Sequence, residues 1–401
     1  MAVPVTPQTV AENLQVVKTT IPQYMRTIID ETVRERYWLA NMMRYGRFSY
    51  NNTGSAMVWN FLYKQIPVTA QVRPTNIIFP DGVYSDMLTL PWRGYFTTES
   101  IHYDDLRLNG GPERILDMSG LKMNAMSSSI KAKIAGELYV NGDATGNEDR
   151  FHGMGTFQKF GGTCLVGDKI KVPDPSGTYA GKSIALAGLG GTWSADGSTF
   201  PNAALGRDWP YGSGTSEYDA LSTLGVNYTS TSWTGTNTWV STLEKVMRWT
   251  KAALIRRGAM ERDSVEPKRI PGTPKDSIET VTGTPPLVNM LSGEMYQDVM
   301  NYFTGRNQQW VPLPSAVDLG FPDVINFDGM GIATDFDVPY GQGYLMSFGN
   351  MEIRSTYNDF IHAEDPVNKI EEQRILYLMR IHGNMRFRPK CFATYRAFAA
   401  S

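Results

Sequence analysis

A glycine-rich run contains the first residues of this sequence whose types and spacing could support chemistry. Gly177, Lys182 and Ser183 approach the phosphate-binding pattern GxxxxGK[ST], but Ser176 stands where the pattern needs its first glycine. The residues 173–175, Pro-Asp-Pro, precede the run in place of a hydrophobic strand. Because such a loop binds phosphate through a complete ring of backbone N–H groups, we interpret the run as a glycine-rich surface turn.

The other acidic and nucleophilic residues also fail to form a catalytic pattern. Residues 143–149 place side-chain oxygens at alternate positions, but they lack the glycine and the bidentate glutamate of a calcium loop. Cys164 and Cys391 lie far apart, the four histidines are scattered singly, and no GxSxG elbow is present. We therefore expect no catalytic, cofactor-binding or metal-binding residue, and we predict that the protein is not an enzyme.

Composition limits the class of protein further. The chain has 401 residues, 41% hydrophobic and 19% charged, with 38 basic and 40 acidic side chains and a net charge of -2. This balance lacks the excess positive charge of a tight nucleic-acid binder. No stretch approaches 18 consecutive apolar residues, and the N-terminus lacks a basic region followed by an apolar one. We expect a globular chain made in the cytoplasm, without a membrane span or a secretion signal.

The first hundred residues predict an arm followed by a ribbon. Periodicity of three to five indicates helices over 9–19 and 28–42. Alternation over 57–63 then indicates a strand with one aromatic face, and Phe-Pro-Asp-Gly at 79–82 indicates a turn. A return strand is expected through Leu88, Leu90, Trp92 and Phe96. A two-stranded ribbon is marginal alone, so we expect its burial to come from outside its own domain.

The rest of the chain reads as helices and strands around one irregular region. A long helix is predicted over 112–140, with apolar residues at helical spacing and a cap at Asn141-Gly142. Residues 161–235 are rich in Gly, Ser and Thr. Beyond them we expect a helix starting at Ser241, a strand over 287–290 and a helix over 293–303. Segments 373–381, 383–384, 385–387 and 391–398 read as strands joined by tight turns.

This order of elements resembles the major capsid proteins of tailed bacteriophages, which have the HK97-like fold. The local resemblance is carried by residues 137–147, ELYVNGDATGN, followed by Gly153-Met154, which look like the end of the family's spine helix and the turn beyond it. Residues 287–292, LVNMLS, are similar to the strand–turn–helix that opens the family's axial (A) domain. The fold class implied is α+β, with an extended ribbon, a spine helix and a Gly-rich insertion.

The resemblance implies a division of the chain into seven segments. They are an N-terminal arm (1–45), an E-loop β-ribbon (46–108), a peripheral (P) domain with the spine helix (109–160), the insertion (161–235), a P-domain helix and connector (236–283), the A domain (284–365) and closing P-domain strands (366–401).

The function implied is that of a shell subunit. Hexamers and pentamers of the chain would form an icosahedral shell in the virion, enclosing double-stranded DNA without sequence specificity, with portal, scaffold and decoration proteins as further partners. We expect inter-subunit contacts from six aromatic residues of the ribbon and arm: Trp59, Phe61, Tyr63, Trp92, Tyr37 and Trp38. Some family members cross-link a ribbon lysine to a P-domain asparagine; Lys64 is the only lysine between residues 46 and 108, and the resemblance makes it a candidate for such a cross-link with Asn368.

Two alternatives stay open at this point. An encapsulin-type compartment shell resembles the same fold and would enclose an enzyme instead of DNA. A glycan-binding protein is the alternative from another class, because aromatic residues in 161–235 could stack on sugars.

Overall fold

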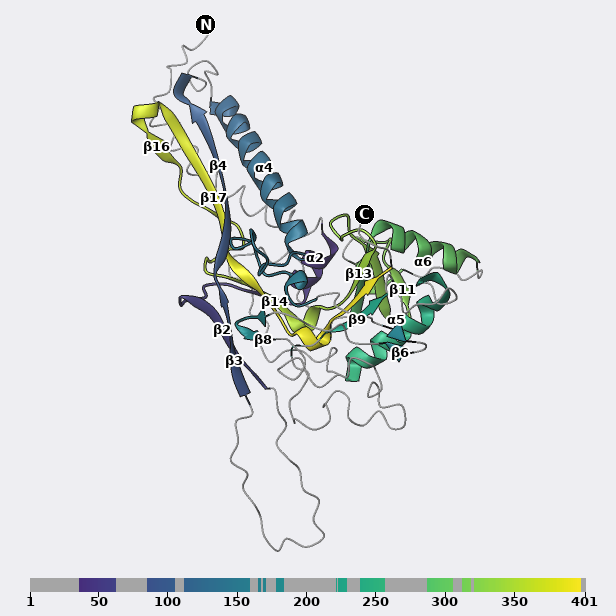
Figure 1. Ribbon diagram of the computed structural model, residues 1–401. Coiled ribbons are helices and arrows are strands. Elements are labelled where there is room, and N and C mark those ends of the chain that lie inside the picture. The colour runs from purple at the N-terminus through teal and green to yellow at the C-terminus, as the bar shows by residue number, and fades with distance from the viewer. Residues whose placement is uncertain are drawn as a thin grey trace, which may run out of the picture.

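The computed structural model describes residues 36–62, 85–104, 112–158, 165–166, 169–170, 178–183, 221, 223–228, 239–256, 287–305, 312–318 and 321–397. The expected helix over 9–19 and the turn at 79–82 lie outside these residues. Figure 1 shows three parts: a wing of long strands beside a long helix, a hairpin that extends the opposite way, and a body with helices around a second sheet.

The first sheet forms the wing and is built around one long strand. We call it the wing sheet, and its strands are β1 (Phe48–Ser49), β4 (Arg93–His102), β14 (Met351–Ser355), β15 (His362–Ala363), β16 (Val367–Lys369) and β17 (Arg374–Phe387). Strand β17 pairs with β4, β14, β15 and β16, all antiparallel. On β17, odd-numbered residues from Ile375 to Ile381 are buried, and even-numbered ones are partly exposed. This period of two gives the wing one covered and one open face.

The second sheet forms the centre of the body and is called the body sheet. Its order is β11 (Ile325–Phe327), β12 (Met330–Thr334), β10 (Leu287–Leu291), β13 (Gln342–Ser347), β18 (Ala393–Arg396) and β9 (Leu224–Asn227). All five residues of β10 are buried, as expected for a central strand. Strand β18 belongs to this sheet, so the closing segment 366–401 is divided between the two sheets.

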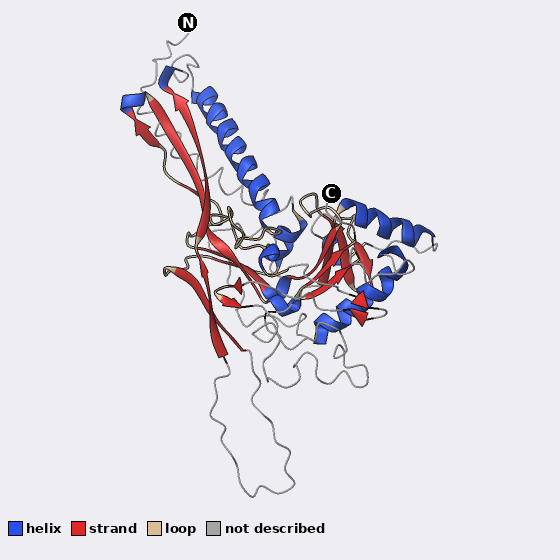
Figure 2. Cartoon of the chain, in the orientation of Figure 1, coloured by secondary structure: helices blue, strands red, loops and turns tan. Residues whose placement is uncertain are grey.

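Helices border the sheets, and short pieces complete the described fold. The helices are α2 (Tyr37–Arg44), α4 (Pro112–Glu137), α5 (Trp239–Arg256), α6 (Gly293–Gly305) and α7 (Pro314–Val317). Two small hairpins come from the 161–235 region: β5 (Leu165–Val166) with β6 (Lys169–Ile170), and β7 (Thr178–Tyr179) with β8 (Lys182–Ser183). The remaining hairpin pairs β2 (Ala56–Leu62) with β3 (Ser85–Pro91) and is called the ribbon. Figure 2 shows the ribbon and the wing continuing in opposite directions from one junction.

The predicted helices that fall within the described residues are present with shifted ends. Helix α4 covers most of 112–140, and its stripe Met126, Ile130 and Ile134 is buried as expected. Helix α5 begins at Trp239, so Ser241 lies inside the helix and not at its cap. In α2, seven consecutive residues from Tyr37 to Met43 are buried, which differs from the amphipathic helix expected over 28–42. A helix surrounded by other elements buries every face.

Two predictions about strands are wrong. The return strand through Leu88 and Phe96 is two strands, because β3 pairs with β2 whereas β4 pairs with β17. Gly383-Asn384 is not a turn but part of the continuous strand β17. A Cβ at position 383 would collide with the carbonyl oxygen of Arg354 on β14. This glycine therefore permits the close approach of two strands.

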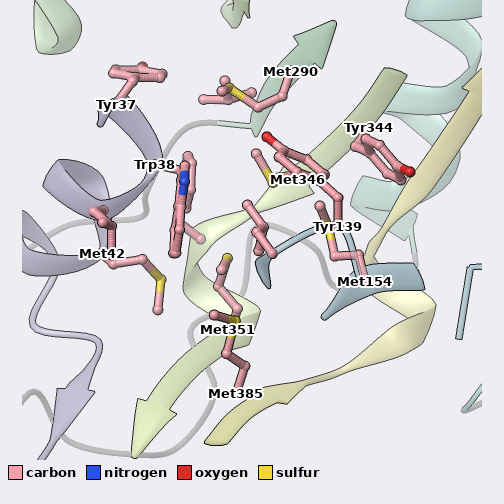
Figure 3. Packing of buried hydrophobic residues seen from close by; sticks show 14 of the residues in the cluster. Tyr37, Trp38, Met42, Tyr139, Met154, Met290, Tyr344, Met346, Met351 and Met385 are labelled. Carbon is pink, nitrogen blue, oxygen red and sulfur yellow. The ribbon is translucent and has the colours of Figure 1, made fainter. Parts of the chain in front are cut away.

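A methionine-rich core joins the parts around α2. Figure 3 shows Trp38 and Met42 of α2 close to Met351 and Met385, which lie on β14 and β17 of the wing sheet. All four side chains are at most 1% exposed. Flexible thioether side chains fill irregular spaces between elements that cross at different angles.

Candidate assembly interface

The ribbon has one face against its own chain and one face open. Met57, Trp59, Leu88 and Leu90 are each at most 9% exposed. They come from alternate positions that face each other across the register, Met57 with Leu90 and Trp59 with Leu88. Opposed residues of an antiparallel pair share a face, so these four form an inner apolar face.

The inner face is covered by a residue from the glycine-rich region. The ring of Tyr179 lies 6.4 Å from the ring of Trp59. The guanidinium of Arg386, which lies on β17, is 5.2 Å from the same Trp59 ring. The Tyr179 hydroxyl accepts a hydrogen bond of 3.0 Å from the backbone N–H of Phe387. Burial raises the pKa of Tyr179 far above its usual value. Hairpin β7–β8 thereby attaches the ribbon to the end of β17.

The outer face of the ribbon is exposed and carries two apolar side chains among polar ones. Val58 is 45% exposed and Met87 is 52% exposed, and Asn60, which pairs with Met87, is exposed as well. The pair Val58 and Thr89 lies beside the pair Asn60 and Met87. Exposed apolar residues on a projecting hairpin mark a surface that can be buried by a partner.

Arginine and tryptophan side chains fix the base of the ribbon. The indole N–H of Trp92 donates a 2.9 Å hydrogen bond to the carbonyl oxygen of Gly54. The next residue, Arg93, donates to the carbonyl oxygens of Gly142 (2.8 Å), Asn147 (3.2 Å) and Arg150 (2.5 Å). Burial lowers the pKa of Arg93, and the carboxylates nearby oppose that effect. One guanidinium thus gathers the turn that follows α4 around the start of β4.

A buried ion pair holds the same turn to the helix. The carboxylate of Glu137 is fully buried and accepts hydrogen bonds from Nη2 (2.8 Å) and Nε (3.0 Å) of Arg150. Lys133, one turn earlier, lies 3.4 Å away. The hydrogen bonds to Glu137 are the main cause of the raised pKa of Arg150. At Gly153 a Cβ would meet the carbonyl oxygen of Glu137, so the glycine allows the turn to pack under the helix end.

A buried asparagine connects this turn with the ribbon and with β17. Asn384 accepts hydrogen bonds from the backbone N–H groups of His152 (3.0 Å) and Met385 (2.8 Å). Its amide donates to the carbonyl oxygen of Pro91 and to Nδ1 of His152, both at 2.8 Å. Nε2 of His152 lies 3.0 Å from Asp143. Because Nδ1 accepts a hydrogen bond, we infer that the proton of a neutral His152 is on Nε2.

The structure places the predicted contact residues at different depths. Tyr37 is 5% and Trp38 is 0% exposed, inside the chain's own core. Trp59 is buried on the inner face, and Phe61 and Trp92 are partly buried. Burial within the chain accounts for Tyr37 and Trp38 without a neighbour, and the role of all these residues between subunits stays a prediction. Tyr63 and Lys64 lie outside the described residues, and Asn368 is exposed on β16.

The groups considered for chemistry have structural partners. Ala180 and Gly181 form the positive-φ turn of hairpin β7–β8, and Lys182 bonds Asp86 of the ribbon at 2.7 Å. This bond is the main reason that the pKa of Asp86 is lowered. The described residues hold no group of three or more His, Cys, Asp and Glu side chains placed for a metal ion. Cys391 is buried, and the tryptophans considered for glycan binding lie outside the described residues.

None of the helices in the described part of the chain combines the length and hydropathy that a membrane span requires.

Two exposed aromatic residues and one covering residue were not identified from the sequence. Phe96 is 75% exposed on β4, and Phe336 is 95% exposed in the β12–β13 connection. The alternation around Phe96 was visible, but its exposure depends on which strand β4 pairs with. The covering role of Tyr179 had no sequence signal, because residues 59 and 179 meet only in the folded chain.

Comparison with known proteins gives one kind of match. No family model matches the sequence, and no curated protein matches it. Among solved structures, the cyanophage A-1(L) capsid asymmetric unit aligns with a TM-score of 0.57 and 14% identity, over 90% of this chain and 93% of that one. The fold is that of a phage capsid protein. The capsid of the native GTA particle aligns with a TM-score of 0.50 and 9% identity, over 90% of each chain.

The match confirms the α+β capsid fold expected from the order of elements. It spans nearly the full length of both chains, so the wing, the ribbon region and the body are compared together. At 14% identity the likeness is one of architecture and not of particular side chains.

Proposed function

We propose that this chain is the major capsid protein of a tailed phage, which assembles as hexamers and pentamers into an icosahedral shell around double-stranded DNA. The observation that carries the proposal is the alignment over nine-tenths of both chains with a cyanophage capsid subunit. The projecting ribbon supports it, since Val58 and Met87 on its outer face are 45% and 52% exposed in the described part of the chain. Under the same proposal the chain is a structural subunit of the shell and not an enzyme.

The segments of the capsid family are assigned within the same proposal. Residues 1–45 form the N-arm, 46–108 the E-loop, and 109–160 the P domain with α4 as spine helix. Residues 284–365 form the A domain around the body sheet. The positions of β10 at the start of the segment 284–365 and of α4 after the ribbon support this division. Strand β18 extends the A-domain sheet from the closing segment.

The ribbon is the part of the subunit that contacts its neighbour in this proposal. Its outer face supplies Val58 and Met87, whereas Trp59 and Phe61 keep the ribbon attached to its own chain. Trp92 fixes the point where the ribbon leaves the wing. Lys64 and Asn368 remain the proposed cross-link pair, and the exposed position of Asn368 on β16 is compatible with such a role. Portal, scaffold and decoration proteins are proposed as further partners in the virion.

Expression of the chain alone tests the proposal. Size-exclusion chromatography and negative-stain electron microscopy are expected to show closed shells, tubes or rings of five or six subunits. If the chain is monomeric, co-expression with the genes that flank it supplies a scaffold, and a chain that still fails to assemble contradicts the proposal. Nucleic acid inside particles purified from infected cells distinguishes a virion from an encapsulin-type shell, which would contain an enzyme.

A further inference from the structure

Strand β4 has a free edge, and one hydrogen bond shows which of its backbone groups face outward. The N–H of Tyr103 donates to the carbonyl oxygen of Gln373, which precedes β17. In an antiparallel pair the direction of backbone groups alternates, so odd-numbered residues of β4 bond to β17. The N–H and C=O groups of Gly94, Phe96 and Thr98 therefore point away from β17. In the described part of the chain no strand pairs with this side of β4.

One end of this edge is closed by charged side chains. The amino group of Lys122 donates a 2.6 Å hydrogen bond to the carbonyl oxygen of Ser100, and the N–H of Ser100 bonds the carboxylate of Glu99 at 3.2 Å. Lysine at an edge strand is a known means of blocking further pairing. The open part is limited to 94–98, and its central residue, Phe96, has a side chain that is 75% exposed.

Among the strands that the structure describes, β2 pairs only with β3, so its other side is a second free edge of a different kind. The N–H of Thr89 donates to Ala180, so it points away from β2, and the pair of Val58 and Thr89 is not hydrogen-bonded across the ribbon. By the same alternation, the N–H and C=O groups of Val58 and Asn60 face outward from β2. Pro91, which lacks an N–H, lies opposite Ala56 at another such position, as the alternation requires.

We propose that the β2 edge of one copy pairs with the β4 edge of the next copy, extending the wing sheet between subunits. The proposal rests on the proposed function, because copies arranged in rings of five or six meet through a head-to-tail contact, which joins two unlike surfaces. The described residues present two unlike free edges, each with an exposed apolar residue among its outward-facing positions. Pairing brings Val58 of one copy beside Phe96 of the next and covers both, and main-chain hydrogen bonds supply the affinity.

A disulfide between these positions can form only between copies. Val58 lies opposite Thr89, seven residues before Phe96, so at about 3.3 Å per residue the two positions are roughly 20 Å apart within one chain. A disulfide requires Cα atoms within about 7 Å. The strands β3 and β4 follow one another from ribbon to wing in Figure 1, which keeps the two positions apart.

The first test uses assembled shells of the double variant V58C/F96C under mild oxidation. Because the contact is head to tail, non-reducing gels are expected to show a ladder that continues beyond dimers. The matched control is V58C/V367C, whose second cysteine replaces an equally apolar, 61% exposed valine on β16, and the unsubstituted chain controls for native cysteines. Three outcomes would overturn the proposal. They are a ladder of equal strength in V58C/V367C, dimers from F96C alone, and the absence of a ladder from intact V58C/F96C shells.

The second test addresses the main chain and does not depend on cysteines. Thr98→Pro removes an N–H that points away from β17, so the subunit keeps its internal ladder, and edge strands tolerate proline. We expect T98P to give folded subunits, with circular dichroism and melting close to the wild type, and at least tenfold fewer shells. Thr98→Ala keeps the N–H and is expected to assemble normally. Normal shells from T98P would refute strand pairing, whereas absence of shells from the wild-type chain would instead refute the proposed function.

Discussion

The side-chain amide of Asn384, on β17, donates a 2.8 Å hydrogen bond to the carbonyl oxygen of Pro91, the last residue of the ribbon strand β3. The same amide donates to Nδ1 of His152, in the turn that follows α4. Three segments that are far apart in sequence therefore meet at one fully buried side chain. Asn384 therefore links the end of the ribbon to the wing.

We expect Asn384→Asp to lower the free energy of unfolding by about 2–3 kcal/mol, because both donors are lost and a buried carboxylate faces a carbonyl oxygen. Urea unfolding of the isolated subunit measures the effect. Asn368→Asp makes the same change at an exposed position on β16 and is expected to stay within about 0.5 kcal/mol of the wild type. Equal effects of the two variants would show that Asn384 does not hold the junction.

Gly383→Ala is expected to destabilise the subunit by about 1–3 kcal/mol, since an added methyl group collides with the backbone of Arg354 and the strands must separate. Thermal and urea unfolding measure the loss. Gly293→Ala is the matched control, because no atom lies within 4 Å of a Cβ at that position. A tolerated G383A would mean that β14 and β17 are farther apart than described.

The raised pKa of Asp335 is expected to make the subunit less stable as the pH rises. Its carboxylate lies 2.9 Å from Arg36 and 3.2 Å from the hydroxyl of Tyr139, yet burial is the larger effect and raises its pKa. An acid whose pKa is raised by folding contributes stability below its unfolded pKa of about 3.9 and loses that contribution as pH rises through the folded pKa. The stability of Asp335→Asn relative to the wild type should therefore increase from about pH 4 upward.

Glu99 serves as a control, because its pKa is lowered by folding whereas that of Asp335 is raised. The hydrogen bond from Lys122, at 2.8 Å, is the main cause of its lowered pKa. Its contribution is present above the unfolded value of about 4.3 and is lost as pH falls through the folded pKa. The wild type should thus lose stability relative to Glu99→Gln as the medium is acidified below about pH 4.3. Unfolding by urea at a series of pH values compares both variants, and parallel curves for the two would contradict the assignment.

Val58→Asp is expected to prevent shell formation while the subunit remains folded. A neighbouring copy would have to bury the new carboxylate without an opposite charge to pair with it, which is costly. Electron microscopy and sedimentation measure assembly, and circular dichroism measures folding. Val317→Asp is the matched control, since Val317 on α7 has the same 45% exposure and lies away from the ribbon. Shells from V58D would show that this face is not an interface.

Local sequence patterns predicted the helices and the central strand. The stripe of α4, the buried run of β10 and the helix that follows it all depend on periodicity within one segment. The strands of the wing were predicted less well. Gly383-Asn384 has the composition of a turn, but pairing with β14 and β4 keeps it extended, and that pairing is set by residues more than 25 positions away.

The candidate interface shows the same limit. Alternation on β2 correctly indicated an aromatic face, and we assigned that face to a neighbour because no nearby segment covers it. In the folded chain Tyr179 and Arg386 cover Trp59, and both come from regions whose position relative to β2 has no local signal. The exposed residues are therefore the small ones on the opposite side, Val58 and Asn60.

The length of β17 has a mechanical consequence. Its residues 374–383 pair with β4 in the wing, and its residues 383–387 pair with β14 beside the methionine-rich core. A single strand of 14 residues cannot bend sharply without breaking its ladders, so the two ends of the wing sheet should tilt together as one lever. Subunits in five-fold and six-fold rings meet at different angles. We expect that difference in curvature to be absorbed in the contacts between copies, and not within the wing.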